Sequence, residues 1–261
     1  MDDKTREGAI GEGTPPLPLT LGSDLAGIVA DGGNSALRAG ESVIAMSHHL
    51  GSGRGTWADL VVLPARAVAA APRSISLVEA AALPLPGLTA WQTLDRLDAR
   101  AGERLLIAGA AGAVGGLALQ IARSRGVKVA ALVSRAAHIA FARDHGGELV
   151  TTDPHALADR AYDAAFDTFG AFVTEAVADG GRYASIATQA GPAPDLSSRG
   201  VRTTVNQVRE DGEGLTGLVE LADSGSLRVR VHSGFFGLQE VRAAHERFLQ
   251  GGLDGKTVLV F

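Results

Sequence analysis

A glycine-rich run between a short apolar strand and an amphipathic helix constrains this chain more than any other segment. Residues 105–116 read LLIAGAAGAVGG, with glycines at 109, 112 and 115. A turn of this composition lets the backbone approach a pyrophosphate, and the following helix offers unpaired N–H groups and a partial positive charge. A tight turn can need glycine for structural reasons alone, but a second apolar run, Val127–Val133, follows at the spacing of a βαβ unit. The pattern therefore predicts a dinucleotide site, whose expected pyrophosphate contacts are Gly109, Gly112, Ala113, Val114 and Gly115.

The end of the second apolar run indicates which dinucleotide is bound. A site for NAD usually places Asp or Glu there, about 20 residues after the glycines, to bind the ribose hydroxyls. This chain has Ser134 and Arg135, and its next carboxylate is Asp144. A hydroxyl and a guanidinium suit the 2′-phosphate of NADP. The alternative is that Arg135 is a solvated surface residue, but the missing acid favours NADPH over NADH as the cofactor.

Composition excludes several classes of protein. The chain has 261 residues, of which 46% are hydrophobic and 20% charged, as in a soluble globular protein. A net charge of −5 without a basic cluster argues against nucleic acid or an anionic membrane as partner. No apolar run is long enough to span a membrane, and the start, MDDKTREGA, is unlike a signal peptide, so we expect a cytoplasmic protein. The absence of cysteine excludes disulfides, zinc–thiolate sites and cysteine nucleophiles.

The hydrophobic pattern separates a β-rich part of the chain from a part in which strands and helices alternate. Residues 1–20 are polar and then rich in proline, which predicts an extended loop rather than a helix. Apolar runs separated by glycine-containing turns predict strands at 26–30, 42–45 and 59–63. Residues 76–97 have a helical pattern that Pro84 and Pro86 interrupt, so its second half is expected to begin near Gly87.

From residue 105 onward the pattern alternates between strand and helix, as in a doubly wound parallel sheet. The six predicted strands are Leu105–Ala108, Val127–Val133, Leu149–Thr151, Ala164–Asp167, Arg182–Ile186 and Val201–Val205. A helix at 214–224, a strand at 227–231, a helix at 238–250 and a strand at 257–261 complete the chain. We therefore expect an α/β fold in which a nucleotide-binding domain, residues 85–226, is inserted between two parts of a β-rich domain, residues 1–84 and 227–261.

Six segments resemble, in order, blocks of the medium-chain dehydrogenase/reductase superfamily, and specifically its zinc-free quinone oxidoreductase and enoyl reductase branch. They are Leu19–Val29 (LTLGSDLAGIV), Gly55–Leu63 (GTWADLVVL), Gly87–Trp91 (GLTAW), Gly109–Gly116, Asp167–Gly170 (DTFG) and Gly255–Leu259 (GKTVL). The resemblance implies a Rossmann sheet within a GroES-like catalytic domain. It also implies four further cofactor contacts, at Thr89, Trp91, Thr152 and Thr188.

Two departures from the family pattern affect the expected site. Zinc-bearing relatives have Gly-His-Glu where this chain has Gly22, Ser23 and Asp24, and none of the seven histidines has metal-ligand spacing to another, so no metal is expected. The resemblance also begins late, because Asp2–Gly8 looks like a segment that follows several opening strands in relatives. We expect a truncated GroES-like domain, and with it either a more open cleft or one that a partner chain closes.

The candidate catalytic residues are three histidines. Reduction of an enone requires a nicotinamide, a group that polarises the carbonyl and a proton source. Residues 9–20 lack the tyrosine that enoyl reductase relatives often carry, and His138 stands near the position of a lysine that modular polyketide enoyl reductases can use. His138 could donate the proton or contact the 2′-phosphate, His48 or His49 could polarise the carbonyl, and solvent could supply the proton instead.

Three functions remain open from the sequence. The first is an NADPH-dependent reductase of a quinone or of a conjugated C=C in a small molecule, for which polyketide or other secondary metabolism is a fitting setting. The second is a non-redox enzyme on the same scaffold, such as a cyclase or isomerase. The third is a protein that binds NADPH without catalysing a reaction.

The last strand of the predicted sheet favours assembly. Val201–Val205 lies at an edge in doubly wound order and is rich in β-branched residues. An exposed edge of this kind pairs readily with another strand, which predicts a homodimer, as the resemblance also implies. The alternative is a monomer whose edge is protected by Arg202 and the adjoining loop.

Overall fold

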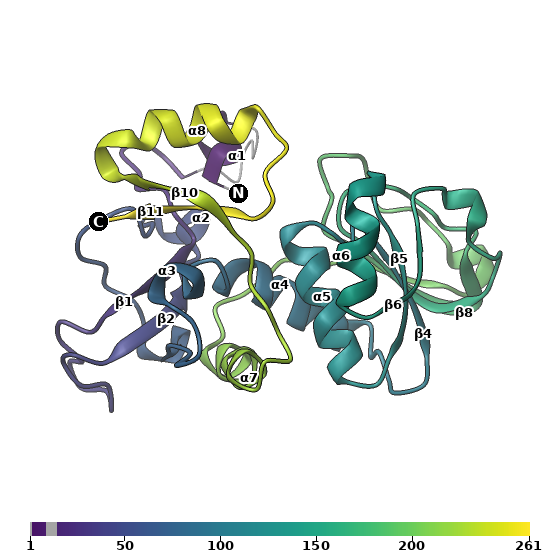
Figure 1. Cartoon of the computed structure of the whole chain (residues 1–261), viewed down its shortest axis with the longest axis horizontal. Helices are drawn as coiled ribbons and strands as arrows, with labels where there is room; N and C mark the ends of the chain where they lie inside the picture. The colour runs from purple at the N-terminus through teal and green to yellow at the C-terminus, as the bar shows by residue number, and fades with distance from the viewer. Residues whose placement is uncertain (1, 9–14) are drawn as a thin grey trace. The chain divides into compact units, whose positions relative to one another are not determined.

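A six-stranded parallel sheet is the largest element of the structure, a computed structural model that describes residues 2–8 and 15–261 (Figure 1). Its strands are β4 (Arg104–Ala108), β5 (Lys128–Leu132), β6 (Gly147–Thr151), β7 (Tyr162–Asp167), β8 (Val177–Ser185) and β9 (Arg202–Val205). They lie in the order β6-β5-β4-β7-β8-β9, so the chain winds outward from β4 in both directions. This order confirms the predicted doubly wound sheet and places β9 at an edge.

The first βαβ unit has the predicted form. Helix α5 (Ala113–Ser124) follows β4, and α6 (Ile139–Asp144), preceded by the short helix η3 (Ala136–His138), follows β5. Leu105, Leu106 and Ile107 of β4 are at most 1% exposed, because β5 and β7 flank this strand on both sides. Apolar residues along the whole strand are typical of a parallel sheet that is covered on both faces.

The predicted alternation of strand and helix is wrong for the second half of the sheet. Only the short helices η4 (Pro154–Ala156) and η5 (Ser197–Arg199) lie between β6 and β9, and residues 168–176 form no helix. The Asp167 carboxylate accepts the backbone N–H groups of residues 169–172. Because these N–H groups bond a side chain, the segment after β7 is held as a loop.

A second compact unit contains the remaining strands. Contacts divide the chain into a β-rich unit, Met1–Leu88 with Arg209–Phe261, and a parallel-sheet unit, Thr89–Val208. The β-rich unit has an antiparallel sheet of β1 (Asp24–Ile28), β2 (Ser42–Met46) and β3 (Val68–Ala70), and a parallel pair of β10 (Val231–Gly237) and β11 (Lys256–Val260). Its other elements are α1 (Asp2–Arg6), α2 (His49–Ser52), η2 (Ala65–Ala67), α3 (Leu77–Ala80), the start of α4 (Pro84–Arg96), α7 (Gly212–Asp223), η6 (Leu238–Glu240) and α8 (Val241–Leu249).

The units divide at 88/89 and 208/209, whereas the sequence placed the domain limits at 84/85 and 226/227. Helix α7 accounts for most of the difference. A Cβ added to its first residue, Gly212, would lie 2.7 Å from the carbonyl oxygen of Arg66 and 2.8 Å from that of Val68, so α7 packs on the chain at β3.

Several predicted elements of the β-rich unit are wrong or displaced. Residues 59–63 form no strand, and Leu60 and Val62 are 77% and 88% exposed; the strand that pairs with β2 is β3, further along the chain. Residues 227–230 are not a strand either, since β10 begins at Val231. Helix α1 lies within the predicted N-terminal loop, of which residues 9–14 are outside the described residues. Pro84 begins α4 instead of interrupting a helix, because a residue in the first turn needs no N–H donor.

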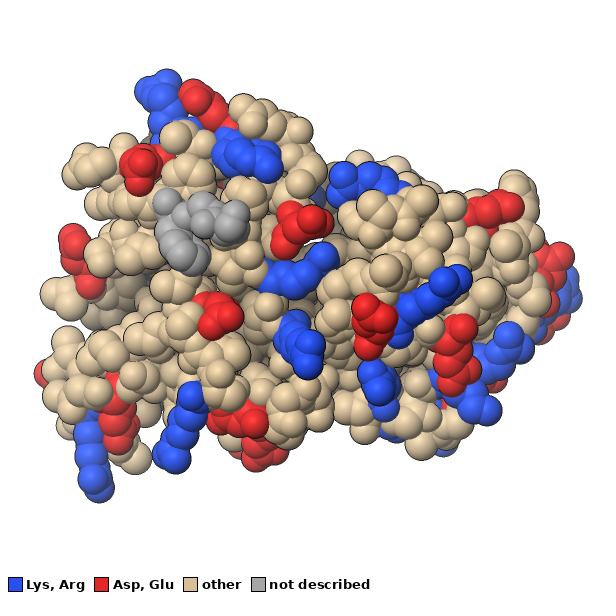
Figure 2. Space-filling model, viewed as in Figure 1, with Lys and Arg blue, Asp and Glu red and all other residues tan. Residues whose placement is uncertain are grey.

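Charged residues of both signs alternate on the face of the molecule in Figure 2. Among the described residues, no helix is both long enough and apolar enough to cross a membrane.

Candidate functional site

The glycine loop after β4 has the geometry of a phosphate-binding turn. Gly109 has φ +81°, and a Cβ there would lie 2.2 Å from Thr168 Oγ1, so only glycine fits. A Cβ on Gly115 would lie 2.2 Å from the Gly109 carbonyl oxygen, which shows how closely α5 packs on the loop. Gly112 differs, because its Cβ would meet a single atom within 4 Å, the Gly109 oxygen at 3.3 Å. The side of the loop at Gly112 is therefore open.

The open side of the loop is also the start of α5. Gly112 is the N-cap, without a side-chain cap, and Gly112 and Ala113 are exposed. The first N–H groups of a helix have no intrahelical acceptor. Together with the helix dipole, those of Ala113, Val114 and Gly115 can bind an anion at this point, as the sequence predicts.

Ser134 and Arg135 lie exposed just beyond β5, next in the sheet to β4. Arg135 Nη2 lies 2.9 Å from His138 Nε2. A guanidinium can only donate, so Nε2 is the acceptor and carries no proton in this arrangement. His138 therefore holds the Arg135 side chain, and its Nε2 has no proton to give to a substrate.

The other predicted cofactor residues are less closely grouped. Thr152 and Thr188 are exposed and follow the carboxyl ends of β6 and β8, the edge at which ligands bind in such sheets. Thr89 is buried in α4, where its carbonyl oxygen accepts from Thr93 Oγ1 at 2.6 Å and from Asn206 Nδ2 at 3.3 Å.

Trp91 is not brought to the glycine loop. Its ring lies under the Arg125 guanidinium, with 4.5 Å between Cζ and the ring centroid, and Asp95 pairs with Arg125 at 2.7 Å. Arg125 follows the last turn of α5, whereas Gly112 precedes the first, and a 12-residue helix is about 18 Å long. The structure thus places Trp91 at the far end of α5 from the loop.

Asp167 supports the loop from β7, a role that the sequence did not predict. Its carboxylate is 2% exposed and accepts four backbone N–H groups and the Tyr183 hydroxyl, the last at 2.8 Å. Burial, and secondarily the Asp167 charge, raises the pKa of Tyr183, so the phenol keeps its proton and donates it. These bonds fix Thr168, whose Oγ1 donates to Ala108 at 2.7 Å directly before Gly109. An acid at the end of an apolar strand was the available signal.

In the β-rich unit, Asp24 forms a partly buried ion pair with Lys256. Asp24 stands at the position of the glutamate in the Gly-His-Glu of zinc-bearing relatives, and one of its carboxylate oxygens contacts Lys256 Nζ of β11. The other accepts the Leu85 N–H of α4 at 2.6 Å. The side chains are 11% and 25% exposed. This pair joins β1, α4 and β11, and the sequence did not predict it, although Lys256 is one of only three lysines.

The adjacent histidines His48 and His49 have opposite surroundings. His48 is exposed, and its backbone N–H donates to the Glu210 carboxylate at 2.9 Å. His49 is 1% exposed, with Nδ1 3.0 Å from Ser23 Oγ and Nε2 3.3 Å from Thr5 Oγ1. Burial lowers the pKa of His49, which the charge of Asp2 opposes, so the neutral imidazole is favoured. The two hydroxyls and the ring form a hydrogen-bonded chain.

The buried His49 makes the stability of the protein pH-dependent. In the unfolded chain the His49 side chain has its ordinary pKa of about 6.5, whereas in the folded chain that pKa is lower. The unfolded state therefore binds a proton more readily, and the free energy of unfolding should fall as the pH drops below about 6.5. Chemical denaturation of wild type and His49→Gln at pH 5 to 8 should show a shallower fall in the variant, by at most about 1.4 kcal/mol per pH unit. The exposed His155→Gln is the control and should follow the wild type. Parallel curves for wild type and His49→Gln would contradict the assignment.

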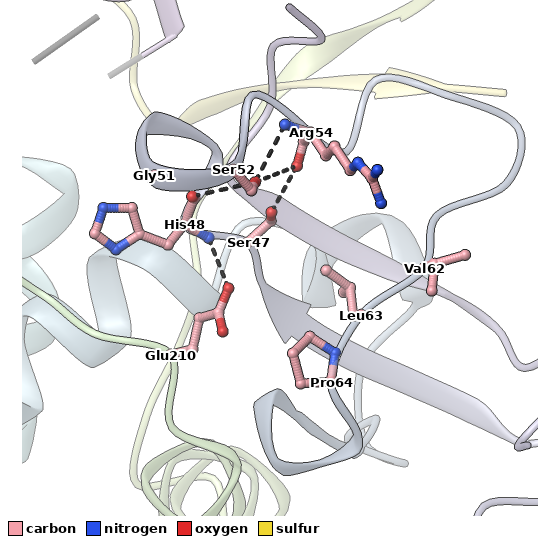
Figure 3. Close-up of a pocket in the computed structure, with 9 residues that line it drawn as sticks. All are labelled: Ser47, His48, Gly51, Ser52, Arg54, Val62, Leu63, Pro64 and Glu210. Atoms are coloured by element: carbon pink, nitrogen blue, oxygen red, sulfur yellow. Dashed lines mark hydrogen bonds between the residues drawn. The ribbon is translucent and has the colours of Figure 1, made fainter. Parts of the chain in front are cut away.

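A pocket of about 360 Å³ lies within the β-rich unit (Figure 3). It is lined by Ser47, His48, Gly51, Ser52, Arg54, Val62, Leu63, Pro64 and Glu210. The described lining thus combines the Arg54 cation, the Glu210 carboxylate, an imidazole, hydroxyl groups and an apolar wall.

The donor groups do not fit a catalytic zinc. Ser23 stands where zinc-bearing relatives have histidine, and the charge of Asp24 is already neutralised by Lys256. No group of three or more His, Cys, Asp and Glu side chains in the described part of the chain could hold a metal ion.

Two family descriptions match the chain, one for each part of it. Residues 1–73 match the alcohol dehydrogenase GroES-like domain, and residues 135–259 match the zinc-binding dehydrogenase family. A quinone oxidoreductase of Pseudomonas aeruginosa is 29% identical over 275 residues, covering 94% of this chain and 83% of the relative. The chain belongs to the medium-chain dehydrogenase/reductase superfamily. Within it, the similarities place the chain in the quinone oxidoreductase branch.

Other relatives are consistent with this assignment. The 2-methylene-furan-3-one reductase of Solanum lycopersicum is 27% identical over 272 residues, covering 99% of this chain and 68% of the relative. An alcohol dehydrogenase superfamily protein of Novosphingobium aromaticivorans has a TM-score of 0.88 at 28% identity, covering 100% and 88% of the two chains. A mycobacterial protein solved with NADPH has a TM-score of 0.82 at 26% identity, covering 100% and 87%.

Proposed function

We propose that this superfamily member is an NADPH-dependent reductase of a quinone or of a C=C conjugated to a carbonyl in a small molecule. The single observation that carries the proposal is the open glycine loop at the start of α5, beside a strand, β5, that is followed by a hydroxyl and a guanidinium instead of an acid. The names of the relatives support the substrate class, since one reduces a quinone and another a methylene-furanone.

The residues around the loop fit a bound dinucleotide phosphate. The N–H groups at the start of α5 would hold the pyrophosphate, and Ser134 with Arg135 would hold the 2′-phosphate. His138 keeps the guanidinium at the end of β5 through its Nε2. When bound, the reduced nicotinamide supplies the hydride.

Selectivity for NADPH should depend on the pair beyond β5. The wild type should bind NADPH more tightly than NADH. The double variant Ser134→Ala, Arg135→Ala should reduce this gap in binding free energy by about 1–3 kcal/mol, because charged hydrogen bonds to the 2′-phosphate are lost. Dissociation constants from fluorescence titration measure the gap. Arg143→Ala, which removes an exposed arginine from α6, should leave the gap unchanged. Equal affinity of the wild type for the two cofactors would refute the argument.

Of the proton sources left open by the sequence, the geometry favours solvent. His49 is buried with both ring nitrogens hydrogen-bonded, and His138 Nε2 accepts from Arg135. His48 is exposed, but in Figure 3 its ring points away from Val62, Leu63 and Pro64 of the pocket. Reduction of a quinone or enone does not require a protein acid, so we propose that it proceeds here without one and without zinc.

Turnover with a panel of quinones and alkenones tests the function. Loss of NADPH absorbance, with formation of the hydroquinone or of the saturated ketone, is the expected result. Conversion of a substrate with no loss of NADPH would favour the cyclase or isomerase alternative. Tight NADPH binding with no turnover of any compound would favour a non-catalytic protein.

We also propose that the protein is a homodimer paired through β9. Within the described part of the chain, this strand has a neighbour in the sheet only on the β8 side. The backbone N–H of Asn206 donates to the Ser185 carbonyl oxygen of β8. Because successive backbone N–H groups along a strand point to opposite sides, the backbone N–H of Thr203 points away from β8. Pairing of this free edge with a second copy would cover it.

Sedimentation at micromolar concentration should give twice the 26.7 kDa mass of the chain for the wild type. Thr203→Pro should shift the protein toward monomer, because it removes an outward N–H. Thr203→Ala keeps that N–H and should remain dimeric, and NADPH binding reports whether the proline variant is folded. A monomeric wild type would refute pairing through β9.

A further inference from the structure

The pocket of the β-rich unit holds a cation that no acid of the described residues neutralises. Arg54 is exposed, and its guanidinium makes no ion pair there. Its backbone, by contrast, is fixed: the N–H donates to Ser52 Oγ at 3.1 Å, and the carbonyl accepts from Ser47 Oγ at 2.9 Å and from Ser52 Oγ at 3.4 Å. Gly53, left-handed at φ 68°, ends α2 directly before it. The loop therefore positions at the pocket a cation that no described acid neutralises.

An apolar wall stands beside this cation. Val62, Leu63 and Pro64 line the pocket, and Figure 3 shows them on the side toward which the Arg54 side chain extends. Val62 is 88% exposed, in a segment that pairs with no strand. Ligand pockets typically combine such apolar surface with a few placed polar groups.

Glu210, the one carboxylate among the described lining residues, is engaged elsewhere. Glu210 accepts the His48 N–H at 2.9 Å, and in Figure 3 it lies below His48, away from the Arg54 guanidinium. Of the Arg54 guanidinium and the Glu210 carboxylate, it is therefore the guanidinium that lies next to the apolar wall. Arginine pairs with carboxylate and phosphate groups through two parallel hydrogen bonds.

We propose that this pocket binds a small organic anion, with a carboxylate or phosphate on Arg54 and an apolar body on Val62, Leu63 and Pro64. Taken with the proposed function, on which this step rests, the anion is the substrate. The reducible molecule is then an enone or quinone that carries an acidic group.

Binding of a saturated compound, which has no conjugated C=C, in the absence of NADPH tests the pocket without any activity. 4-Oxo-4-phenylbutanoate should bind the full chain at least about tenfold more tightly than its methyl ester, since charged hydrogen bonds are worth more than 1.4 kcal/mol. Arg54→Gln should abolish that difference, and Arg54→Lys should keep part of it. Phenyl phosphate as a second probe distinguishes a phosphate site from a carboxylate site by its relative affinity. Titration calorimetry measures all of these.

Two further variants control for net charge. Arg38→Gln removes an exposed arginine from the loop between β1 and β2 of the same unit and should not affect binding. Glu210→Gln keeps an acceptor for the His48 N–H and removes a like charge, so the acid should bind equally or more tightly. Three results would overturn the proposal. They are equal affinity of the wild type for the acid and the ester, an unchanged preference for the acid in Arg54→Gln, and weaker binding of the acid by Glu210→Gln than by the wild type.

Activity with the unsaturated pair separates this proposal from the proposed function. 4-Oxo-4-phenylbut-2-enoic acid should have a higher kcat/KM than its methyl ester in NADPH oxidation. Equal values for the two compounds would retain the reductase and refute the anion site as a substrate site. Arg54-dependent binding of the saturated acid, with no NADPH oxidation by either unsaturated compound, would retain the anion site and refute the reductase.

Discussion

Replacing Gly112 by Val is expected to abolish the binding of NADPH and of NADH while the protein remains folded. Gly112 has φ −73° and ψ 174°, a conformation that valine adopts without strain, and its Cβ would meet only the Gly109 oxygen, at 3.3 Å. The branched side chain would instead fill the open side of the loop, where the pyrophosphate must approach the N–H groups of α5. Fluorescence titration should show no saturable binding at millimolar cofactor.

Gly237→Val provides a matched control for this variant. Gly237 also precedes a helix, with φ −74°, and its Cβ would have an ordinary contact of 3.8 Å with Glu240. It lies in the β-rich unit, so cofactor affinity should be unchanged. Retained binding in Gly112→Val would place the cofactor elsewhere, whereas an altered circular dichroism spectrum would call for Gly112→Ala, which should weaken binding less.

Breaking the Asp24–Lys256 pair is expected to produce the largest loss of stability. Asp24→Asn keeps an acceptor for the Leu85 N–H but leaves the Lys256 ammonium, 25% exposed, without its counter-ion. We expect the free energy of unfolding of the β-rich unit to fall by about 2–4 kcal/mol, somewhat below the cost of breaking a fully buried pair. Lys256→Met should cost a similar amount, since it leaves the Asp24 charge with a single N–H donor.

The double variant shows whether the charges act on each other. Asp24→Asn with Lys256→Met removes both charges and should recover part of the lost stability. In urea denaturation with an unchanged m-value, the double variant should therefore lose less free energy of unfolding than the two single variants added together. Arg100→Met breaks the exposed pair with Asp98 and should leave the midpoint unchanged. Additive losses in the double variant would show that the two charges do not stabilise each other.

Local patterns in the sequence were sufficient for the first half of the parallel sheet. The run Leu105–Ile107 predicted a strand, and the glycines at 109, 112 and 115 predicted the turn that follows it. Such features depend on residues adjacent along the chain, so their geometry follows from backbone sterics and hydrophobic spacing. The position of β9 at an edge follows from the strand order of a doubly wound sheet, which the alternating pattern predicted.

Pairing between distant segments could not be read from the same patterns. Residues 59–63 and 68–70 are both apolar enough to form a strand, and only the second pairs with β2. The segment after β7 is a loop in which the Asp167 carboxylate accepts four backbone N–H groups. In each case the decision was made by a hydrogen-bond partner whose position depends on the tertiary fold.

The sequence by itself determined the class of the fold, the order of its strands and the phosphate-binding character of the loop between β4 and α5. Only the tertiary structure showed that His49 is buried and His48 exposed, and that Asp24 pairs with Lys256, 232 positions away. It also showed that the Trp91 ring lies under Arg125, at the opposite end of α5 from the glycine loop. The physical reason is that spacing along the chain specifies backbone conformation. The burial and charge of a side chain depend instead on which remote segments pack around it.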